Sequence, residues 1–401
     1  KNAYVTLLTR PSYLAGAILL AHTLTKHSPT TPLIITYTPA TLPEACVDAL
    51  RREALYSNII LWGVEGVRVP DGDEKGEAKG MVAERFADTW TKLRVFDLWE
   101  MPEKRDTLCW LDADMMIFSD PSPFIFNAGN EEYLSSRTDG EEKEDPFKIM
   151  AVHTCVCNLD NDAWAPQDWI PKNCALTYLS PTQAIAPVSP NPPTFSNFNS
   201  GTFVYKPSRA LAHHIWSTFE SLGPTRLRAL PFPDQDFLNL VFERRWRALS
   251  WTVNALKTWR YWHPNFWTRD ADVAVLHYIV DKPWAARVGR GGTAGYKGRD
   301  GVTHRWWWDE FEGWREERGR RGEEGLVGVV GRYVDGGEEM GGEDMRAVGG
   351  GAQDFAKKWV GGKAGEGKEE EQEEGKGERH APVLRKPMLG ERGHGPVVRG
   401  R

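Results

Sequence analysis

The N-terminal part of the chain alternates between short apolar runs and segments with helical spacing. Runs rich in β-forming residues occur at positions 3–9, 33–35 and 58–62. Between them, apolar residues recur at helical spacing over 12–24, and a second helix is predicted over 43–52. Strands that alternate with helices pair in parallel, because each helix carries the chain back along the sheet. This order predicts an α/β fold with a mostly parallel central sheet that helices cover on both faces.

The same kind of pattern continues to about Gly319. Helices are predicted over 91–99, 208–222 and 234–243, and strands over 107–111, 201–205 and 273–277. The stretch 119–193, which is dense in Pro, Asp and Asn, is interpreted as irregular insertions over the sheet. A Trp-rich segment, 304–311, is predicted to be the final helix. We therefore assign residues 1–319 to a single folded domain.

The remaining residues, 320–401, have a different composition. Most of the 39 glycines of the chain follow Arg287, and the segment 369–374 is almost entirely glutamate. Such a segment buries too little apolar surface to offset the entropy that it would lose on ordering. We expect a disordered, low-complexity tail rich in Gly, Glu and Arg.

Charge and composition exclude several classes of partner. The net charge of −6 argues against nucleic acid, which requires a basic face. No apolar run approaches the ~20 residues that span a bilayer, so no membrane segment is expected. The chain has no Asn-x-Ser/Thr sequon, and its five cysteines are an odd set in a large chain. These features favour a cytoplasmic protein.

Two carboxylates one residue apart, Asp112 and Asp114, directly follow the predicted strand 107–111. Ligands of α/β sheets collect at the carboxyl ends of the strands, where both side chains reach a hard cation. In isolation, such a pair can also be one helix cap and one solvated acid. Here Trp110-Leu111 and Met115-Met116 flank the pair, and two charges within so apolar a run are costly unless a cation neutralises them. We therefore predict a metal site.

A phosphohydrolase of the haloacid dehalogenase type is an alternative for the same pattern, with the first Asp as nucleophile. In those enzymes the motif normally lies on the first strand of the domain. At least three strand-helix steps precede Asp112 here, which counts against this alternative.

Further motifs flank the acidic pair in a fixed order. They are Val5–Thr9 with Tyr13, then Thr91-Lys92-Leu93, Phe198-Asn199-Ser200-Gly201, Asp234-Gln235, and His277-Tyr278 followed by Lys282-Pro283-Trp284. Over roughly Tyr4 to Trp284 this series resembles glycosyltransferase family 8, the retaining transferases that include glycogenins and galactinol synthases. The resemblance implies a GT-A domain, which is the nucleotide-diphospho-sugar transferase fold.

The resemblance also implies roles for individual residues. Asp112, Asp114 and His277 would bind the metal, and Asp234, Gln235 and Lys282 would be catalytic, with Lys282 on the diphosphate. The donor would contact a further set of residues: Leu7, Thr9, Arg10 and Tyr13 around the base, and Arg85, Lys92, Ala113, Asn199 and Ser200 elsewhere. The sequence departs from the glycogenin pattern at Arg10 (usually Asn), Pro231 (usually Asp) and Val280 (usually Gly).

The implied reaction is transfer of a hexose from UDP-galactose or UDP-glucose, with retention and with Mn²⁺, which suits mixed carboxylate and imidazole ligands. The expected acceptor is a small polyol or sugar, as in galactinol synthases, because Cys155-Val156-Cys157 and Arg260–Pro264 resemble stretches of that branch. A glycogenin-like primer that glucosylates its own Tyr261 is the alternative. A third is a sugar-nucleotide-binding module without turnover. A homodimer is left open.

A group of potential soft ligands lies outside these motifs. One residue separates His153 from Cys155, and one separates Cys155 from Cys157. Cys174 follows further along the chain. The number of ligands matches a zinc site, but the Cys-x-Cys spacing differs from the usual Cys-x₂-Cys. The sequence leaves open whether these residues bind metal.

Overall fold

The computed structural model describes residues 1–69, 88–136, 147–162, 165–180, 191–342 and 345. All of these belong to one compact unit, Lys1–Val360. Within this part of the chain, no helix is both long enough and apolar enough to cross a membrane.

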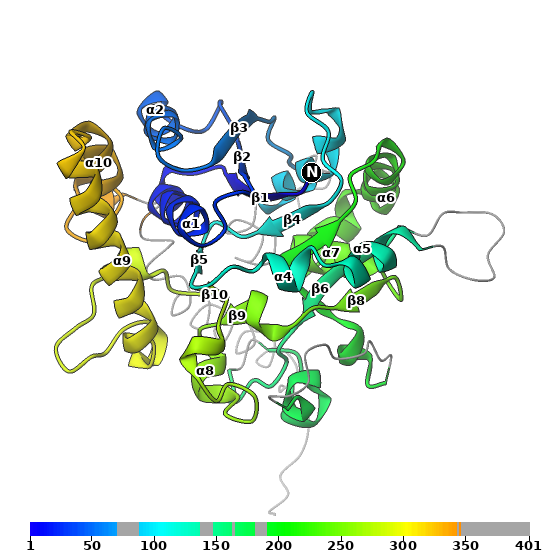
Figure 1. The fold of residues 1–401 in the computed structure, drawn as a ribbon. Coiled ribbons are helices and arrows are strands. Elements are labelled where there is room, and N and C mark those ends of the chain that lie inside the picture. Colours follow the sequence, from blue (N-terminus) through cyan, green and yellow to red (C-terminus); the bar gives the residue numbers. More distant parts are fainter. Residues whose placement is uncertain (70–87, 137–146, 163–164, 181–190, 343–344, 346–401) are drawn as a thin grey trace, which may run out of the picture. The chain divides into compact units, whose positions relative to one another are not determined.

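A seven-stranded sheet forms the centre of this unit (Figure 1). Its order is β3-β2-β1-β4-β7-β6-β8. Neighbouring strands run parallel except at β7, which is antiparallel to both β4 and β6. The expected α/β fold with a mostly parallel sheet is therefore confirmed. The strands are β1 (Ala3–Leu8), β2 (Leu33–Tyr37), β3 (Ile59–Gly63), β4 (Leu108–Leu111), β6 (Ile149–His153), β7 (Phe198–Tyr205) and β8 (Trp246–Ala248).

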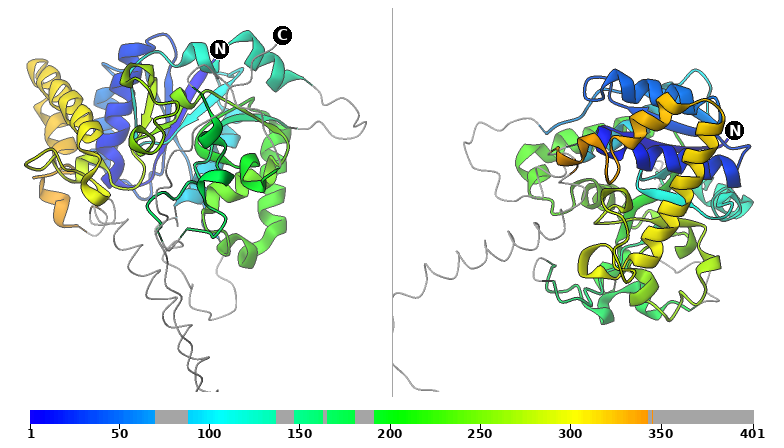
Figure 2. Two further views of the ribbon diagram at one scale, coloured as in Figure 1. Left: turned by 90° about the horizontal axis from the view of Figure 1, so that it is seen from below. Right: turned by 90° about the vertical axis from the view of Figure 1, so that its left-hand side faces the viewer.

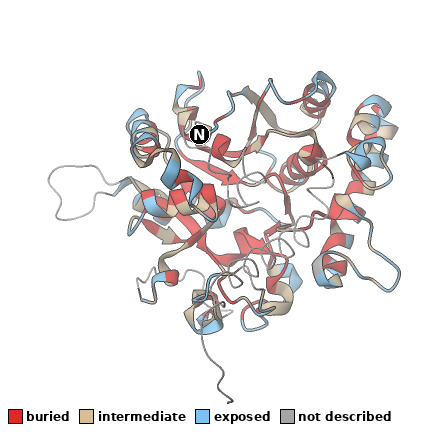
Figure 3. Cartoon of the chain, turned by 180° about the vertical axis from the view of Figure 1, so that it is seen from behind, coloured by how far each residue is buried: buried red, intermediate tan, exposed pale blue. Residues whose placement is uncertain are grey.

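Both faces of the sheet are covered, because successive residues of each strand point to opposite sides. In β1, Tyr4 and Leu8 belong to one apolar cluster and Ala3 and Val5 to the other. The first cluster includes α1 (Leu14–His27) and α2 (Glu44–Glu53). The second includes the 3-10 helix η2 (Thr89–Glu100), α6 (Arg209–Arg228) and α7 (Pro233–Val241). Figure 3 shows the buried residues running along the strands and on the inner sides of these helices.

A second, three-stranded sheet positions the candidate site. It consists of β5 (Met115–Ile117), β10 (Val275–His277) and β9 (Ala255–Leu256), in that order. β10 runs antiparallel to β5 and pairs His277 with Met115, so the end of β10 lies beside the Asp112–Asp114 turn (Figure 1).

Short helices connect these elements. They are α4 (Ser122–Ile125), α5 (Ala128–Ser135), α8 (Trp259–Trp262), η1 (Pro11–Tyr13), η3 (Pro171–Asn173), η4 (Ala175–Tyr178), η5 (Pro193–Ser196), η6 (Trp251–Val253), η7 (Asp270–Asp272), η8 (Pro283–Ala285), η9 (Tyr296–Gly298) and η10 (Glu338–Gly341). The stretch 119–193 was expected to be irregular, yet it contains α4, α5 and β6, and β6 is a strand of the central sheet.

The expected domain end at Gly319 is corrected by two C-terminal helices. α9 (Gly301–Arg320) is longer than the predicted final helix, and α10 (Glu324–Gly331) follows it. Leu326, Val330 and Val334 are buried in the same cluster as α1 and α2, and these helices lie side by side in Figure 2. The glycine-rich composition concealed an apolar stripe at helical spacing, which packs against the helices α1, α2 and α9.

Candidate active site and metal centre

The two acids and the histidine predicted to bind metal come together. Asp112 and Asp114 lie in the turn between β4 and β5, and His277 ends β10. Their ligand atoms all lie within 4.8 Å of one another. His277 Nε2 is 3.3 Å from Asp114 Oδ1 and 3.6 Å from Asp112 Oδ2. Two carboxylates and one imidazole therefore face a common point.

The ring of His277 is fixed by its other nitrogen. Nδ1 donates to Asn254 Oδ1 at 2.9 Å, which leaves Nε2 directed at the acids. Asn254 in turn donates from Nδ2 to Asn199 Oδ1 at 2.8 Å. Gly201 makes room for the ring, since a Cβ atom there would lie 2.4 Å from His277 Cε1. Partners of this kind orient a ligating histidine in metal sites.

Two buried lysines balance the acids. Lys282 pairs with Asp114 Oδ2 and donates to the carbonyl of Tyr278 at 2.9 Å. Burial raises the pKa of Asp114, but Lys282 and His277 outweigh it and hold that pKa well below its usual range.

Lys92 lies between two carboxylates, 3.0 Å from Asp112 Oδ1 and 2.6 Å from Asp234 Oδ2. Burial lowers the pKa of Lys92, yet the two acids reverse this and raise the pKa above its ordinary value. The site therefore alternates charges, and every buried charge in this set has an opposite partner.

A hydrogen-bonded network continues from β7 to the first turn of α7. Ser200 Oγ donates to Asp234 Oδ2 at 2.9 Å, and Asn199 Nδ2 donates to Gln235 Oε1 at 3.0 Å. The backbone N–H of Ser200 also donates to Gln235 Oε1, at 3.3 Å. The residues that sequence analysis took from two separate motifs thus form one connected wall.

The residues expected around the base lie at the carboxyl end of β1. Tyr13 adjoins the candidate site, since Lys282 Nζ lies 5.8 Å from its ring centre. The Tyr13 ring also meets Trp284 edge to face at 5.7 Å. Arg10 pairs instead with Asp88. The other expected donor contacts are Leu7 and Thr9 at the end of β1, Ala113 between the two acids, and Arg85, which lies outside the described residues.

The sequence model of Glycosyl transferase family 8 matches residues 5–287, which is more than half of the chain. The chain belongs to Glycosyl transferase family 8. Galactinol synthase 3 of Arabidopsis thaliana is 27% identical over 313 residues, which cover 77% of this chain and 80% of that protein. Galactinol synthase 1 of Ajuga reptans is 25% identical over 289 residues, which cover 71% and 74%.

Among solved structures, the glycosyltransferase GlyE of Streptococcus pneumoniae TIGR4 matches with a TM-score of 0.43 and 15% identity. The match covers 78% of this chain and 61% of that one. Family membership supports a glycosyltransferase, and the α/β fold agrees with the GT-A class that the family implies.

Val280, one of the departures from the family pattern, has an unusual backbone conformation. Val280 stands where the family usually has glycine, and its φ is 65°. This left-handed region is readily occupied by glycine but is unfavourable for a β-branched residue. Val280 therefore occupies a backbone conformation to which glycine is better suited.

Sequence reasoning did not assign two residues that support the acids. Asn254 orients His277, and Trp110 donates from Nε1 to Asp112 Oδ1 at 2.8 Å. Both adjoin strands of the site, but only the three-dimensional pairing of β4, β9 and β10 reveals their contacts.

Proposed function

We propose that this chain transfers a hexose from a UDP-sugar to a small polyol or sugar acceptor, with retention of configuration, in the manner of a galactinol synthase. The observation that carries the proposal is the convergence of Asp112, Asp114 and His277 beside Lys282. The family assignment and the galactinol synthase relatives support the same reaction class.

The three candidate metal ligands fit a divalent ion that prefers oxygen and imidazole ligands. Asp112 offers Oδ2 and Asp114 offers Oδ1 toward His277 Nε2, while Gly201 leaves space for the ring. We propose Mn²⁺, which accepts this mixture of ligands more readily than Mg²⁺. When bound, the ion would neutralise charge that builds up on the departing UDP.

Lys282 would act on the diphosphate from the side of Asp114. Its ammonium group is held by a carboxylate and by the Tyr278 carbonyl, and the Tyr13 ring covers it at 5.8 Å. An amine held in place near a leaving phosphate stabilises charge in the transition state without having to reorganise. Tyr13 would at the same time border the base.

The wall formed by β7 and α7 would hold the sugar. Asn199 and Gln235 carry amide groups that match sugar hydroxyls, and they already fix one another. Asp234 is buried, paired with Lys92 and hydrogen-bonded by Ser200. A carboxylate fixed in this way would orient the sugar or stabilise positive charge at its reactive carbon.

The surroundings of Tyr261 favour a small acceptor over self-glucosylation. Its hydroxyl donates to Asp300 Oδ1 at 3.4 Å, and Arg299 lies 4.6 Å from its ring centre. Burial and Asp300 raise the pKa of Tyr261 above its ordinary value. A covered phenol that resists ionisation is a poor nucleophile, so we expect it to be a packing residue.

The test is UDP release from UDP-galactose and UDP-glucose with Mn²⁺, with and without inositol. We expect acceptor-stimulated release that Asp234→Asn lowers by about 10²-fold or more. Asp236→Asn, two residues further along the same helix, is the matched control and should keep the activity. Binding of UDP-sugar with no release under any acceptor would favour the non-catalytic module instead.

Self-glucosylation is tested by intact mass after incubation with UDP-glucose and Mn²⁺. We expect no added hexose on the wild-type chain or on Tyr261→Phe, which keeps the ring and removes only the hydroxyl. A hexose ladder on the wild type that disappears in Tyr261→Phe would make the protein a glycogenin-like primer. A homodimer and a cytoplasmic location remain predictions.

A further inference from the structure

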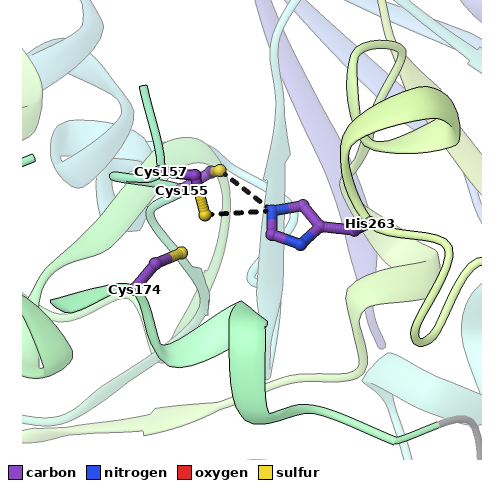
Figure 4. A group of neighbouring side chains, drawn as sticks. All are labelled: Cys155, Cys157, Cys174 and His263. Atoms are coloured by element: carbon purple, nitrogen blue, oxygen red, sulfur yellow. Dashed lines mark hydrogen bonds between the residues drawn. The ribbon is translucent and has the colours of Figure 1, made fainter. Parts of the chain in front are cut away.

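Three cysteines and one histidine that are distant in sequence meet on the insertion beside the candidate site (Figure 4). Cys155 and Cys157 follow β6, Cys174 lies between η3 and η4, and His263 follows α8. Their ligand atoms all lie within 4.8 Å of one another. His263 Nε2 is 3.2 Å from Cys155 Sγ and 3.5 Å from Cys157 Sγ.

These spacings match the edges of a metal tetrahedron. With metal–sulfur bonds of ~2.3 Å and metal–nitrogen bonds of ~2.1 Å, a nitrogen and a sulfur ligand of a tetrahedral site are about 3.6 Å apart. Figure 4 shows all four side chains directed toward one another. The histidine contributes Nε2, and the three thiols come from two separate segments, which is the usual construction of a structural zinc site.

The histidine differs from the one suggested by the sequence pattern. His153 was the fourth candidate ligand, but its ring packs edge to face against Trp246 at 4.9 Å. Its place is taken by His263, about a hundred residues further along the chain. No local spacing rule connects these four residues, so the set could not be recognised before folding brought them together.

Burial makes the thiols costly to ionise without a cation. Cys157 and Cys174 are buried, as is His263. Three neighbouring thiolates would repel one another, and a bound cation would neutralise that charge.

We propose that Cys155, Cys157, Cys174 and His263 bind one Zn²⁺ ion in a closed, tetrahedral, structural site. Thiolate sulfur is a soft ligand, and four protein ligands leave no open position for a substrate. Zinc binding releases the thiol protons to solvent, while the imidazole coordinates in its neutral form. The site is chemically distinct from the oxygen-rich set at Asp112, Asp114 and His277.

The ion would join three segments that hydrogen bonds already hold near one another. Thr154, next to Cys155, donates from its backbone N–H to Asn197, two residues before Asn199. On the other side, Asn265, two residues after His263, donates to the carbonyls of Leu176 and Leu179 at 2.9 and 2.8 Å. Zinc at this point would tie the segment after β6, the turn between η3 and η4 and the segment after α8 to one another.

A disulfide is the competing fate of three neighbouring thiols. Cys155 and Cys157 are only two residues apart, a spacing that strains disulfide geometry, and a bond from either to Cys174 would leave one thiol and His263 unused. Only a metal ion would engage all three thiols and the imidazole of His263 at once. The two possibilities differ in mass and in metal content, so one preparation distinguishes them.

The first test measures metal in the full-length protein, purified with reductant and dialysed. Elemental analysis should find one zinc per chain. Exchange into Co²⁺ should give the intense thiolate-to-cobalt charge-transfer absorption and the visible bands of a tetrahedral ion. The Asp112→Asn variant should retain both signals, because the proposed Mn²⁺ site has no sulfur. Absence of zinc and of the cobalt bands, or a disulfide among these cysteines in peptide mapping, would overturn the proposal.

The second test uses matched variants. Cys174→Ser should lose the zinc, whereas Cys46→Ser and Cys109→Ser, at buried free cysteines outside the cluster, should retain it. Should Cys174→Ser fail to fold, His263→Cys provides the second measurement: a fourth thiolate keeps zinc and shifts the cobalt charge-transfer band. Equal zinc loss in all the serine variants, or an unchanged cobalt spectrum in His263→Cys, would contradict the assigned ligands.

Discussion

Replacing each acid of the candidate metal site by asparagine should have unequal effects on stability. The two side chains have the same chemistry but different surroundings. Asp114 is buried and paired with Lys282, whereas the side chain of Asp112 is 25% exposed and is shared between Lys92 and Trp110. The unequal cost follows from the partner that each substitution leaves behind.

Asp114→Asn removes the negative charge that pairs with the buried ammonium of Lys282, while the contacts of Lys282 with the Tyr278 carbonyl and the Tyr13 ring remain. Removing one partner of a buried ion pair typically costs about 3–5 kcal/mol. Asp112→Asn keeps an oxygen for Trp110 and Lys92, and Lys92 keeps Asp234, so the cost should be about 1 kcal/mol. The two variants should differ by roughly 2–4 kcal/mol in the free energy of unfolding.

The assay is urea denaturation followed by tryptophan fluorescence at pH 7.5, with Mn²⁺ binding measured separately. Both variants should lose Mn²⁺ affinity, and only Asp114→Asn should lose substantial stability. Because the pKa of Asp114 is held below its ordinary 3.8, this stabilisation is present above about pH 4 and is lost as the pH falls further. The double variant Asp114→Asn/Lys282→Met should regain most of the loss, since neither member of this buried pair then carries a charge.

Equal stability of the two single variants would refute this reasoning, because it would mean that the Lys282–Asp114 pair contributes nothing. Failure of the double variant to recover would show that shape, and not charge, determines the cost. Retention of Mn²⁺ affinity by both single variants would refute the metal site itself.

Truncation after Gly319 removes the buried Leu326 and Val330 and should lower the melting temperature by several degrees. Truncation after Val360 should leave the melting temperature unchanged. Equal melting curves for the two truncated proteins would contradict this prediction. Val280→Gly should stabilise the chain by about 1 kcal/mol in urea, by relieving a left-handed φ. Burial raises the pKa of Asp236 to about 6, so stability is lost as the pH rises from about 4 through 6. Asp236→Asn should match the wild type near pH 4 and exceed it by about 2 kcal/mol at pH 7.5.

The sequence predicted those features that depend on local pattern. The alternation over 3–62 led correctly to a parallel arrangement of β1, β2 and β3. The acidic pair was placed at the end of a buried strand, and β4 ends at Leu111. In both cases the decisive information lies within a few residues, where periodicity and burial are directly readable.

The sequence failed where a contact depends on distant pairing. β6 was not recognised within a Pro- and Asp-rich stretch, because its strand character comes from lying between β7 and β8. α10 was not recognised in a glycine-rich segment, although its Leu326 and Val330 belong to the same buried cluster as α1 and α2. His153 was preferred over His263 as a thiol partner because sequence proximity was the only available guide.

The two groups of metal-capable side chains in the described part of the chain differ in ligand chemistry. With Asp112, Asp114 and His277 as ligands, a bound ion would have one imidazole and two carboxylates and would keep open positions for phosphate oxygens, as an exchangeable catalytic ion requires. The cysteine set provides four ligands in a buried corner and leaves none open. The soft set would bind zinc tightly and would be poorly suited to manganese, while the hard set would compete weakly for zinc against three thiolates. Sorting by ligand softness would thus allow one chain to keep a permanent ion in the insertion and an exchangeable ion at the donor, without either ion occupying the wrong site.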